Sequence, residues 1–167
     1  MAISSIAKNM RDGSLTLSDG TTPTALDLTV QYEAGDFSIS GLSQGLKDVA
    51  TYLDRGDLFS VRHTTATFPS LGFSATLTDV SDTGGGASET LPDIIMRTTG
   101  SPFAGAVSTL GVNADVYTLS LKWTITEPGG GTHTVTCDDC HCTIDMSEGD
   151  PNSFSVSATC FGSITLT

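Results

Sequence analysis

The sequence predicts a mainly β fold: a β-sandwich or partly open barrel with one short α-helix and a long inter-strand loop. Several segments alternate apolar and polar residues with a period of two, the pattern of strands that bury one face. Gly (18 residues), Ser and Thr are abundant, while long helix-forming runs are scarce. The length of 167 residues and the 38% share of hydrophobic residues fit a folded core. Because no internal repeat is visible, we expect residues 1–167 to form a single domain.

The first strands are expected between residues 14 and 40. Leu15 and Leu17 alternate with polar neighbours, and residues 18–20 (Ser-Asp-Gly) have the composition of a turn. Phe37 and Ile39 continue a strand pattern further on. Residues 26–33 alternate as a strand does. One face of this strand carries Leu26, Leu28, Val30 and Tyr32, and the other carries Asp27, Thr29, Gln31 and Glu33.

The segment 41–54 fits two interpretations. The apolar residues that follow helical spacing are Leu42, Leu46, Val49, Ala50 and Leu53. Val49, Thr51 and Leu53 also alternate as they would in a strand, so loop, hairpin and helix all remain open. In each case the connecting segment is longer than a hairpin turn requires. Long ordered loops are often functional.

One short helix is predicted over residues 90–99. Thr90 can cap it, with Asp93 three residues on in a capping-box arrangement. Arg97 suits the negative C-terminal end, and Gly100 can terminate the helix. The side chains that share one face are Leu91, Ile94, Ile95 and Thr98.

Further strands are predicted over residues 57–80, 116–125, 132–146 and 153–167. The last two segments pair around a turn at residues 147–152.

The charge balance is acidic. Seven Lys and Arg residues against 19 Asp and Glu residues give a formal net charge of −12 at pH 7. Such a surface repels phosphates, which disfavours conventional nucleic-acid binding and an anionic membrane surface. No secretory signal is visible, and no stretch approaches the roughly 20 apolar residues of a membrane helix. We therefore expect synthesis in a reducing cytoplasm and no membrane insertion.

A cysteine-rich segment is the sharpest local signal. Cys137, Cys140 and Cys142 surround His141, and Cys160 lies downstream. The CxxCH pattern is that of covalent haem attachment, but haem needs an exported chain and a second axial ligand. These thiols could also hold zinc, although structural zinc sites usually draw on two CxxC pairs and only one is present. The simplest interpretation is a set of small buried thiols, so we expect no metal and no cofactor.

A disulfide is a further alternative for these cysteines. If the last hairpin turns near Asp150, Cys140 and Cys160 fall nearly opposite each other. Cross-strand Cβ distances of about 4.5–5.5 Å need some adjustment before a bridge forms. A catalytic pair of Cys140 and His141 is geometrically poor, because adjacent strand residues point to opposite faces. We therefore predict that the chain is not an enzyme.

A resemblance to a known family rests on several segments. They are residues 28–37 (LTVQYEAGDF), 54–57 (DRGD), 61–62 (VR), 73–75 (FSA), 147–157 (SEGDPNSFSVS) and 162–164 (GSI). These segments, and the order of elements along most of the chain, resemble the major tail tube protein of long-tailed bacteriophages.

The resemblance implies a structural virion protein that polymerises as stacked, hexameric rings into the phage tail tube, a channel for genome delivery. Strands from each copy join a continuous inner barrel, and the helix packs outside it near a neighbouring subunit through Leu91, Ile94 and Ile95. The long loop, at about residues 41–54, reaches the neighbouring ring. Its candidate contact residues are Leu42, Leu46, Lys47, Asp48, Tyr52 and Asp54.

The same resemblance implies the partners and the location. The partners are copies of the chain, a tail terminator, tail-tip or baseplate proteins and a tape-measure protein in the lumen. DNA passes through without specific binding, and an acidic wall would repel its phosphates. We expect Asp27, Glu33 and Asp36 to face the lumen, because they lie on or beside the polar face of an early strand. The protein would reside in the virion tail after assembly in the host cytoplasm.

A non-catalytic β-sandwich binding module, such as an adhesin of a virion or cell surface, is the alternative function. Sugar-binding modules usually expose aromatic residues, but here aromatics are 7% and the single Trp, Trp123, is expected in the core. Self-association distinguishes the tube subunit from this alternative.

Overall fold

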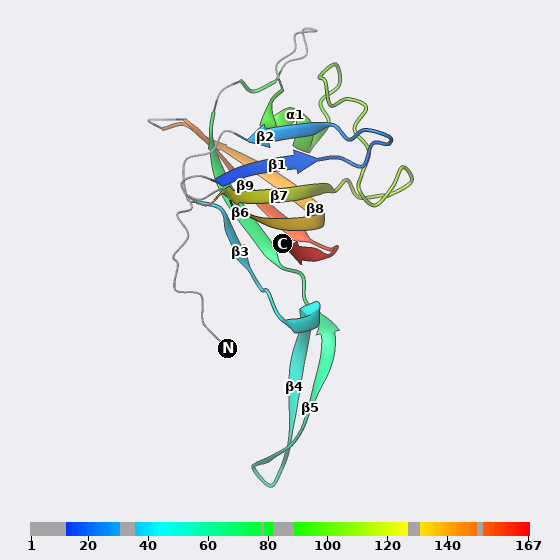
Figure 1. Cartoon of the computed structure of the whole chain (residues 1–167), viewed down its shortest axis with the longest axis vertical. Helices are drawn as coiled ribbons and strands as arrows, with labels where there is room; N and C mark the ends of the chain where they lie inside the picture. Colours follow the sequence, from blue (N-terminus) through cyan, green and yellow to red (C-terminus); the bar gives the residue numbers. More distant parts are fainter. Residues whose placement is uncertain (1–12, 31–35, 78, 82–88, 127–130, 150–151) are drawn as a thin grey trace.

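The computed structural model describes residues 13–30, 36–77, 79–81, 89–126, 131–149 and 152–167. Within these residues the chain forms an eight-stranded sheet, a separate two-stranded sheet and one short α-helix (Figure 1). The elements are β1 (Gly13–Ser18), β2 (Asp27–Val30), β3 (Ser38–Ser40), a 3-10 turn (Gln44–Leu46), β4 (Lys47–Asp54), β5 (Asp57–Ala66), β6 (Ser70–Thr76), α1 (Leu91–Met96), β7 (Leu119–Thr126), β8 (Thr132–Ser147), β9 (Ser153–Cys160) and β10 (Ile164–Leu166). The predicted mainly β fold is confirmed. No described helix is long and apolar enough to cross a membrane.

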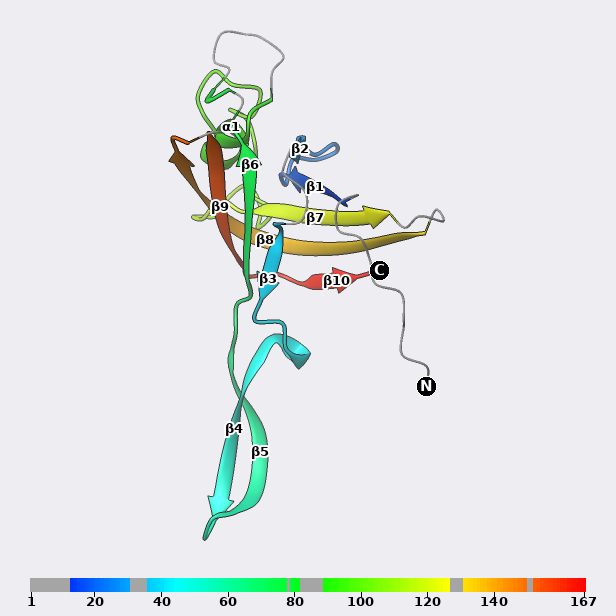
Figure 2. The same ribbon diagram turned by 90° about the vertical axis from the view of Figure 1, so that its left-hand side faces the viewer.

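The larger sheet folds over on itself. Its strands follow the order β2-β1-β7-β8-β9-β6-β3, and β10 pairs with β8 off this path. The first half of β8 pairs with β7 and β10, whereas its second half pairs with β9. β1, β7 and β10 therefore run across the direction of β6 and β9 (Figure 2). The result is an open sandwich rather than a closed barrel, and β2 and β3 end the described strand order.

A bulge in β8 forms the corner between the two halves. Leu119 pairs with Cys140 and Leu121 with Cys137, so β8 has one more residue than β7 in this interval. Asp139, inside the bulge, takes a left-handed φ of 54°. Bulges bend the strand that carries the extra residue, which explains how one strand serves both halves.

The core lies between the two halves of the sheet. Leu28 and Val30 on β2 are buried while Asp27 and Thr29 are exposed, which confirms the predicted alternation there. Residues 31–33 of the predicted pattern lie outside the described residues. Trp123 is half-buried, packed against the core rather than within it.

The predicted helix and its cap are confirmed. Thr90 Oγ1 accepts a hydrogen bond from Asp93 N (3.3 Å) and donates one to Asp93 Oδ2 (2.7 Å). The helix ends at Met96, earlier than the predicted residue 99. The reason is that Arg97 takes a left-handed conformation (φ 53°) and its N–H closes the last turn on Asp93 O.

Of the conformations left open for residues 41–54, the structure has the hairpin. Residues 47–54 are strand β4, which pairs with β5 in an antiparallel hairpin, so the strand interpretation of this segment is the one that holds.

Candidate functional site

The β4–β5 hairpin is the most prominent feature outside the sandwich. It projects away from the body (Figures 1 and 2), and within the described chain its two strands pair with each other alone. Nearly every side chain of both strands is exposed, on both faces. A lone two-stranded hairpin is only marginally stable in water, so this hairpin would gain stability from packing against another surface.

The hairpin is closed at both ends. Arg55 (φ 51°) and Gly56 (φ 97°) form a two-residue turn with two positive φ angles, the arrangement of type I′ turns whose twist matches that of paired strands. At the base, Thr67 N donates to Leu46 O (2.9 Å). The hairpin thus has a defined register although no other described strand supports it.

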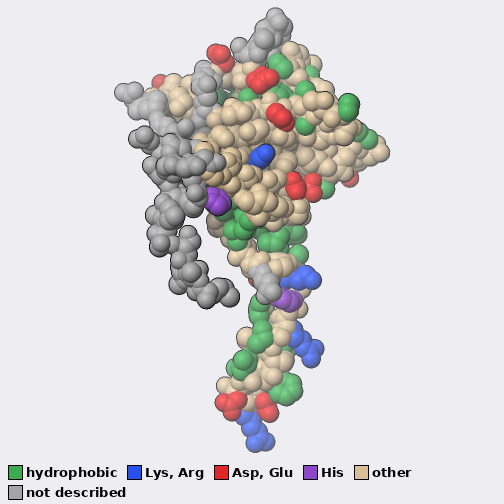
Figure 3. Space-filling view, viewed as in Figure 1, with side chains coloured by type: hydrophobic (Ala, Val, Ile, Leu, Met, Phe, Trp, Pro, Cys, Tyr) green, Lys and Arg blue, Asp and Glu red, His purple; other side chains and the backbone are tan. Residues whose placement is uncertain are grey.

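One face of the hairpin carries most of its exposed apolar side chains, together with Thr51 and His63. The register pairs residues 49 with 63, 51 with 61 and 53 with 58, and it leaves residue 59 as a bulge. We call the following exposed side chains the hairpin apolar face: Val61 (54%), Val49 (56%), Leu53 (63%), Leu58 (63%) and Phe59 (73%). Apolar side chains are visible along the whole length of the hairpin in Figure 3. An exposed apolar surface of this kind marks an interaction site or an aggregation hazard.

The charge of the hairpin differs from that of the body. Residues 47–66 carry Lys47, Arg55 and Arg62 against Asp48, Asp54 and Asp57, which leaves four basic and sixteen acidic residues in the rest of the chain. The hairpin is therefore formally neutral while the remainder holds the whole net charge of −12. Its basic side chains are spread from base to tip (Figure 3).

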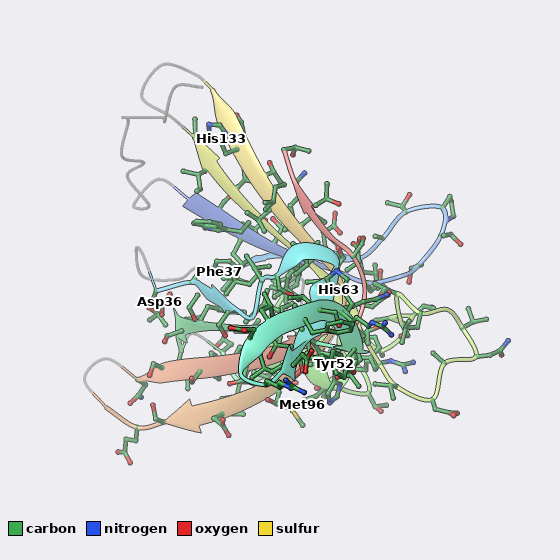
Figure 4. All side chains as sticks on the ribbon, turned by 90° about the horizontal axis from the view of Figure 1, so that it is seen from below. Asp36, Phe37, Tyr52, His63, Met96 and His133 are labelled. Carbon is green, nitrogen blue, oxygen red and sulfur yellow. The ribbon has the colours of Figure 1, made fainter. Side chains whose placement is uncertain are left out.

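The six loop residues expected from the sequence lie in or next to the hairpin. Leu42 is exposed just before the 3-10 turn, Leu46 is half-buried at the end of that turn, and Lys47, Asp48, Tyr52 and Asp54 are exposed on β4. Tyr52 lies beside Arg62, whose Cζ is 5.9 Å from the ring centroid. Figure 4 looks along the hairpin and labels Tyr52 and His63 on it. The sequence alone does not single out Phe59 and Val61, because the alternation in residues 57–66 predicts an ordinary half-buried strand.

A second exposed apolar surface lies on the body. It is a recess of about 600 Å³, which we call the body recess, and its lining residues are Leu110, Asp115, Val116, Tyr117, His141 and Phe161. Phe161 packs edge-to-face on Phe68, with ring centroids 5.2 Å apart. Burial raises the pKa of Tyr117, whose hydroxyl has no hydrogen-bond partner within the described structure. The recess offers apolar side chains with one carboxylate at its edge.

The expected lumen residues are not brought together within one subunit. Asp27 is exposed on β2, at one end of the strand order. Asp36 precedes β3, at the other end, and its Oδ2 accepts a hydrogen bond from Ser74 N (2.7 Å). It lies beside Phe37, away from the hairpin (Figure 4). Glu33 lies outside the described residues.

Hydroxyl side chains cover the outward face of β3, β6, β9 and the second half of β8. The exposed ones are Ser38, Ser40, Ser70, Ser74, Thr76, Thr143, Ser155 and Ser157. Some bond to each other or to backbone, as in Ser40 Oγ to Ser70 Oγ (2.7 Å). Asp145 is exposed on the same face. This face is therefore polar but carries little charge.

The helix residues expected at a subunit contact belong to the core of this subunit. Leu91, Ile94 and Ile95 are 7%, 0% and 9% exposed. Met96, at the end of α1, is 64% exposed. Among the residues of α1, Met96 is therefore the side chain that one subunit leaves exposed.

The four cysteines are buried free thiols at the corner of the sandwich. Cys140 and Cys160 are direct partners across β8 and β9, as the sequence predicted. His141 is exposed while Cys140 and Cys142 are buried, so the adjacent residues do point to opposite faces. No group of three or more His, Cys, Asp or Glu residues in the described chain is arranged to hold a metal ion.

Comparison with solved structures finds a similar fold in chains of contractile injection systems and of the anti-feeding prophage. Neither the protein-family models nor the curated proteins give a match. A chain of the extended sheath–tube complex of the extracellular contractile injection system PVC matches with a TM-score of 0.59 and 11% identity, over 98% of this chain and 93% of that one. The PVC sheath/tube terminator matches with a TM-score of 0.55 and 12% identity, over 92% of both chains. The tube-terminating cap of the anti-feeding prophage matches with a TM-score of 0.53 and 12% identity, over 100% and 94% of the two chains. At these identities the similarity is one of fold, and it spans nearly the full length of each chain.

Proposed function

We propose that this chain is a structural, non-catalytic subunit of a tail-like tube, which assembles with copies of itself into stacked, hexameric rings. The observation that carries the proposal is the projecting hairpin with its exposed apolar face, in a chain whose whole fold resembles tube and terminator chains. A heterologous contact that closes gives a ring, and a second contact between rings gives a filament. Ring closure covers the free edges of β2 and β3, and the hairpin makes the contact between rings.

The body recess is the acceptor that we propose for the hairpin of another copy. Both surfaces are apolar, and the neutral hairpin brings Arg55 and Arg62 towards a body that is strongly acidic. Asp115 at the recess is a candidate partner for one of these cations. Burying the exposed apolar side chains on both sides supplies the driving force, at about 25 cal/mol per Å².

The partners follow from this role. They are copies of this chain, a terminator at one end of the tube and a baseplate or tip complex at the other. The tube encloses a tape-measure protein during assembly and then passes its cargo, which is DNA if the particle is a phage tail. Asp27, Glu33 and Asp36 are the proposed acidic residues of the channel wall. The subunit is made in the host cytoplasm and resides in the tail of the particle.

A tube terminator is the second candidate function, because two of the similar chains come from a terminator and a tube cap. A terminator forms one ring and stops, whereas a tube subunit continues. Extended self-assembly of the pure protein therefore separates the two functions.

Photo-crosslinking tests the hairpin contact directly. Benzoylphenylalanine at position 59 should give crosslinks between copies that map to residues 110–117 or 161. The same probe at position 64, which strand alternation puts on the other hairpin face, is the matched control. Mixing isotope-labelled and unlabelled protein identifies intermolecular products. Assembled protein whose position-59 probe reacts only within its own chain, or no more than the position-64 probe, would contradict the proposed contact.

A further inference from the structure

The cysteine cluster is a feature that the tube function does not use. Cys137, Cys140 and Cys160 are each at most 1% exposed and lie at the corner where β8 bends. Cys140 Sγ and Cys160 Sγ both approach the carbonyl oxygen of Asp138, at 3.8 and 3.2 Å. Two thiols that share one acceptor are close neighbours.

The backbone geometry at this pair suits a disulfide. The backbone N–H of Cys160 donates to Pro69 O (2.9 Å). The backbone polar groups of Cys160 therefore point towards β6 and away from β8. The next residue, Phe161, donates its N–H to Asp139 O (3.1 Å). Cys140 and Cys160 are therefore a non-hydrogen-bonded antiparallel pair, for which Cα atoms are about 4.5 Å apart. Disulfides span Cα distances of about 4.4–6.8 Å.

The other two cysteines have no such partner. Cys137 pairs with Leu121 and Ile164, and Cys142 pairs with Ala158. Of the four cysteines, Cys140 and Cys160 alone are direct partners in the strand register, although the Cys137 thiol also contacts Cys160.

We propose that Cys140 and Cys160 are a disulfide-forming site of the folded subunit, oxidised by small disulfide compounds once the protein leaves a reducing compartment. A thiolate of Cys160 attacks the small disulfide, forming a mixed disulfide and releasing one thiol. The Cys140 thiolate then attacks Cys160 Sγ, forming the bridge and releasing the second thiol. Two protein thiols lose two electrons and two protons, and the small disulfide gains them as two thiols.

The hydrogen bonding of the cluster favours this order of attack. Thiol hydrogen bonds from Cys137 and Cys140 lower the pKa of Cys160, whereas the same hydrogen bonds, and then burial, raise the pKa of both donors. Because both thiols are buried, the oxidant reaches them only after local opening, for which the neighbouring three-residue strand β10, with Thr165 and Leu166 exposed, is the candidate. Short strands of this kind open locally without global unfolding.

Peptide mapping tests the site on the full-length protein. The sequence has no Lys or Arg after Lys122, so one tryptic fragment, residues 123–167, contains all four cysteines. After treatment of the native protein with 2-hydroxyethyl disulfide and alkylation, this fragment should be lighter by two hydrogens and carry two alkyl groups instead of four. Cleavage before Asp residues should then leave residues 139–144 joined to residues 150–167. The thermal midpoint of the oxidised protein should rise by roughly 6–12 °C over that of the reduced protein.

Two variants serve as matched controls. Cys137→Ser and Cys142→Ser should keep the linked pair of peptides, whereas Cys140→Ser should abolish it. Four alkylated cysteines after oxidant treatment, or a bridge that includes Cys137, would overturn the proposal. The wild-type map decides the question even if Cys140→Ser fails to fold. Because the bridge lies within one subunit, its failure leaves the tube function untouched.

Discussion

Asp19 is a buried carboxylate that ties two distant loops together. Its Oδ1 accepts hydrogen bonds from Thr21 N (3.1 Å) and Leu26 N (2.7 Å), and its Oδ2 accepts from Val107 N (2.9 Å) and from the Thr21 hydroxyl. Burial alone would raise the pKa of Asp19, but these hydrogen bonds together lower it below the usual value. The ionised side chain therefore stabilises the fold.

Asp19→Asn should lower the free energy of unfolding by about 1–3 kcal/mol at pH 7, because the amide replaces one acceptor oxygen with a donor. Since the folded pKa is depressed, the stabilisation is complete above the unfolded pKa of about 3.9 and is lost as pH falls through the folded value. Urea titrations at pH 7 and pH 3, on either side of the sequence pI of about 4.2, measure the difference between wild type and variant. That difference should shrink at pH 3, and an equal or larger difference would contradict this role.

Gly20 occupies a position with no room for a side chain. A Cβ there would lie 2.3 Å from Ser108 O and 2.9 Å from Thr109 Cα, both backbone atoms. Gly20→Ala should therefore destabilise the protein by about 1–3 kcal/mol, as overpacking does. Gly105→Ala is the control, because a Cβ at that position meets nothing within 4 Å. The measurement is thermal unfolding of both variants. Equal midpoints would contradict the prediction, because they would show that the backbone at Ser108 moves aside at little cost in free energy.

The facing pair of Cys140 and Cys160 could be predicted from sequence, while the bulge beside it could not. Period-two alternation and a turn near residue 150 fix the register between β8 and β9. The bulge at Asp138 and Asp139 depends on hydrogen bonds from distant residues, such as Ser120 Oγ and Ser163 Oγ to Asp138 (both 2.9 Å). No local pattern reports such contacts.

Among the secondary-structure elements, the β4–β5 hairpin is the one whose conformation the local hydrophobic pattern predicts least well. Residues 41–54 satisfy helical spacing and alternation at once, so periodicity could not select one of them. The register that decides the matter comes from pairing with residues 57–66. The sequence predicts α1 more firmly because its cap, formed by Thr90 and Asp93, is local. The end of α1 depends instead on the left-handed conformation of Arg97, which propensity does not favour.

Phe59→Asp should abolish self-assembly and leave the subunit folded. Phe59 is 73% exposed and far from the core, so a charge there costs little in the monomer but much in an apolar contact. The fraction of protein in assemblies should fall at least tenfold in sedimentation, while the thermal midpoint stays within about 2 °C.

Thr64→Asp adds the same charge to the other face of the hairpin and serves as the matched control. It should assemble nearly as well as wild type. Equal loss of assembly in both variants would indicate a general charge effect rather than a contact through the hairpin apolar face.

The net charge acts at the scale of the whole molecule. Copies that each carry −12 repel one another, and salt screens this repulsion over a Debye length of about 30 Å at 0.01 M and about 8 Å at 0.15 M. Raising the salt concentration over this range should therefore lower the protein concentration at which light scattering begins to rise. Assemblies that dissolve as salt is added would indicate instead that ion pairs between copies dominate the contact.

A single subunit leaves several of its surfaces exposed. The sequence resembled a phage tail tube protein, and the folded chain resembles components of contractile injection systems. The outer edges of β2 and β3, which have no second partner strand among the described residues, and the exposed hairpin are features that a second copy would cover.

The most direct test of the central claim is negative-stain electron microscopy of the purified protein, concentrated at 0.15 M salt. We expect rings of uniform diameter with a central hole, and their stacking into tubes of the same width. Single rings that never stack would favour the terminator function. A protein that stays monomeric at every concentration, and also when mixed with preformed tube ends or baseplates, would contradict the account.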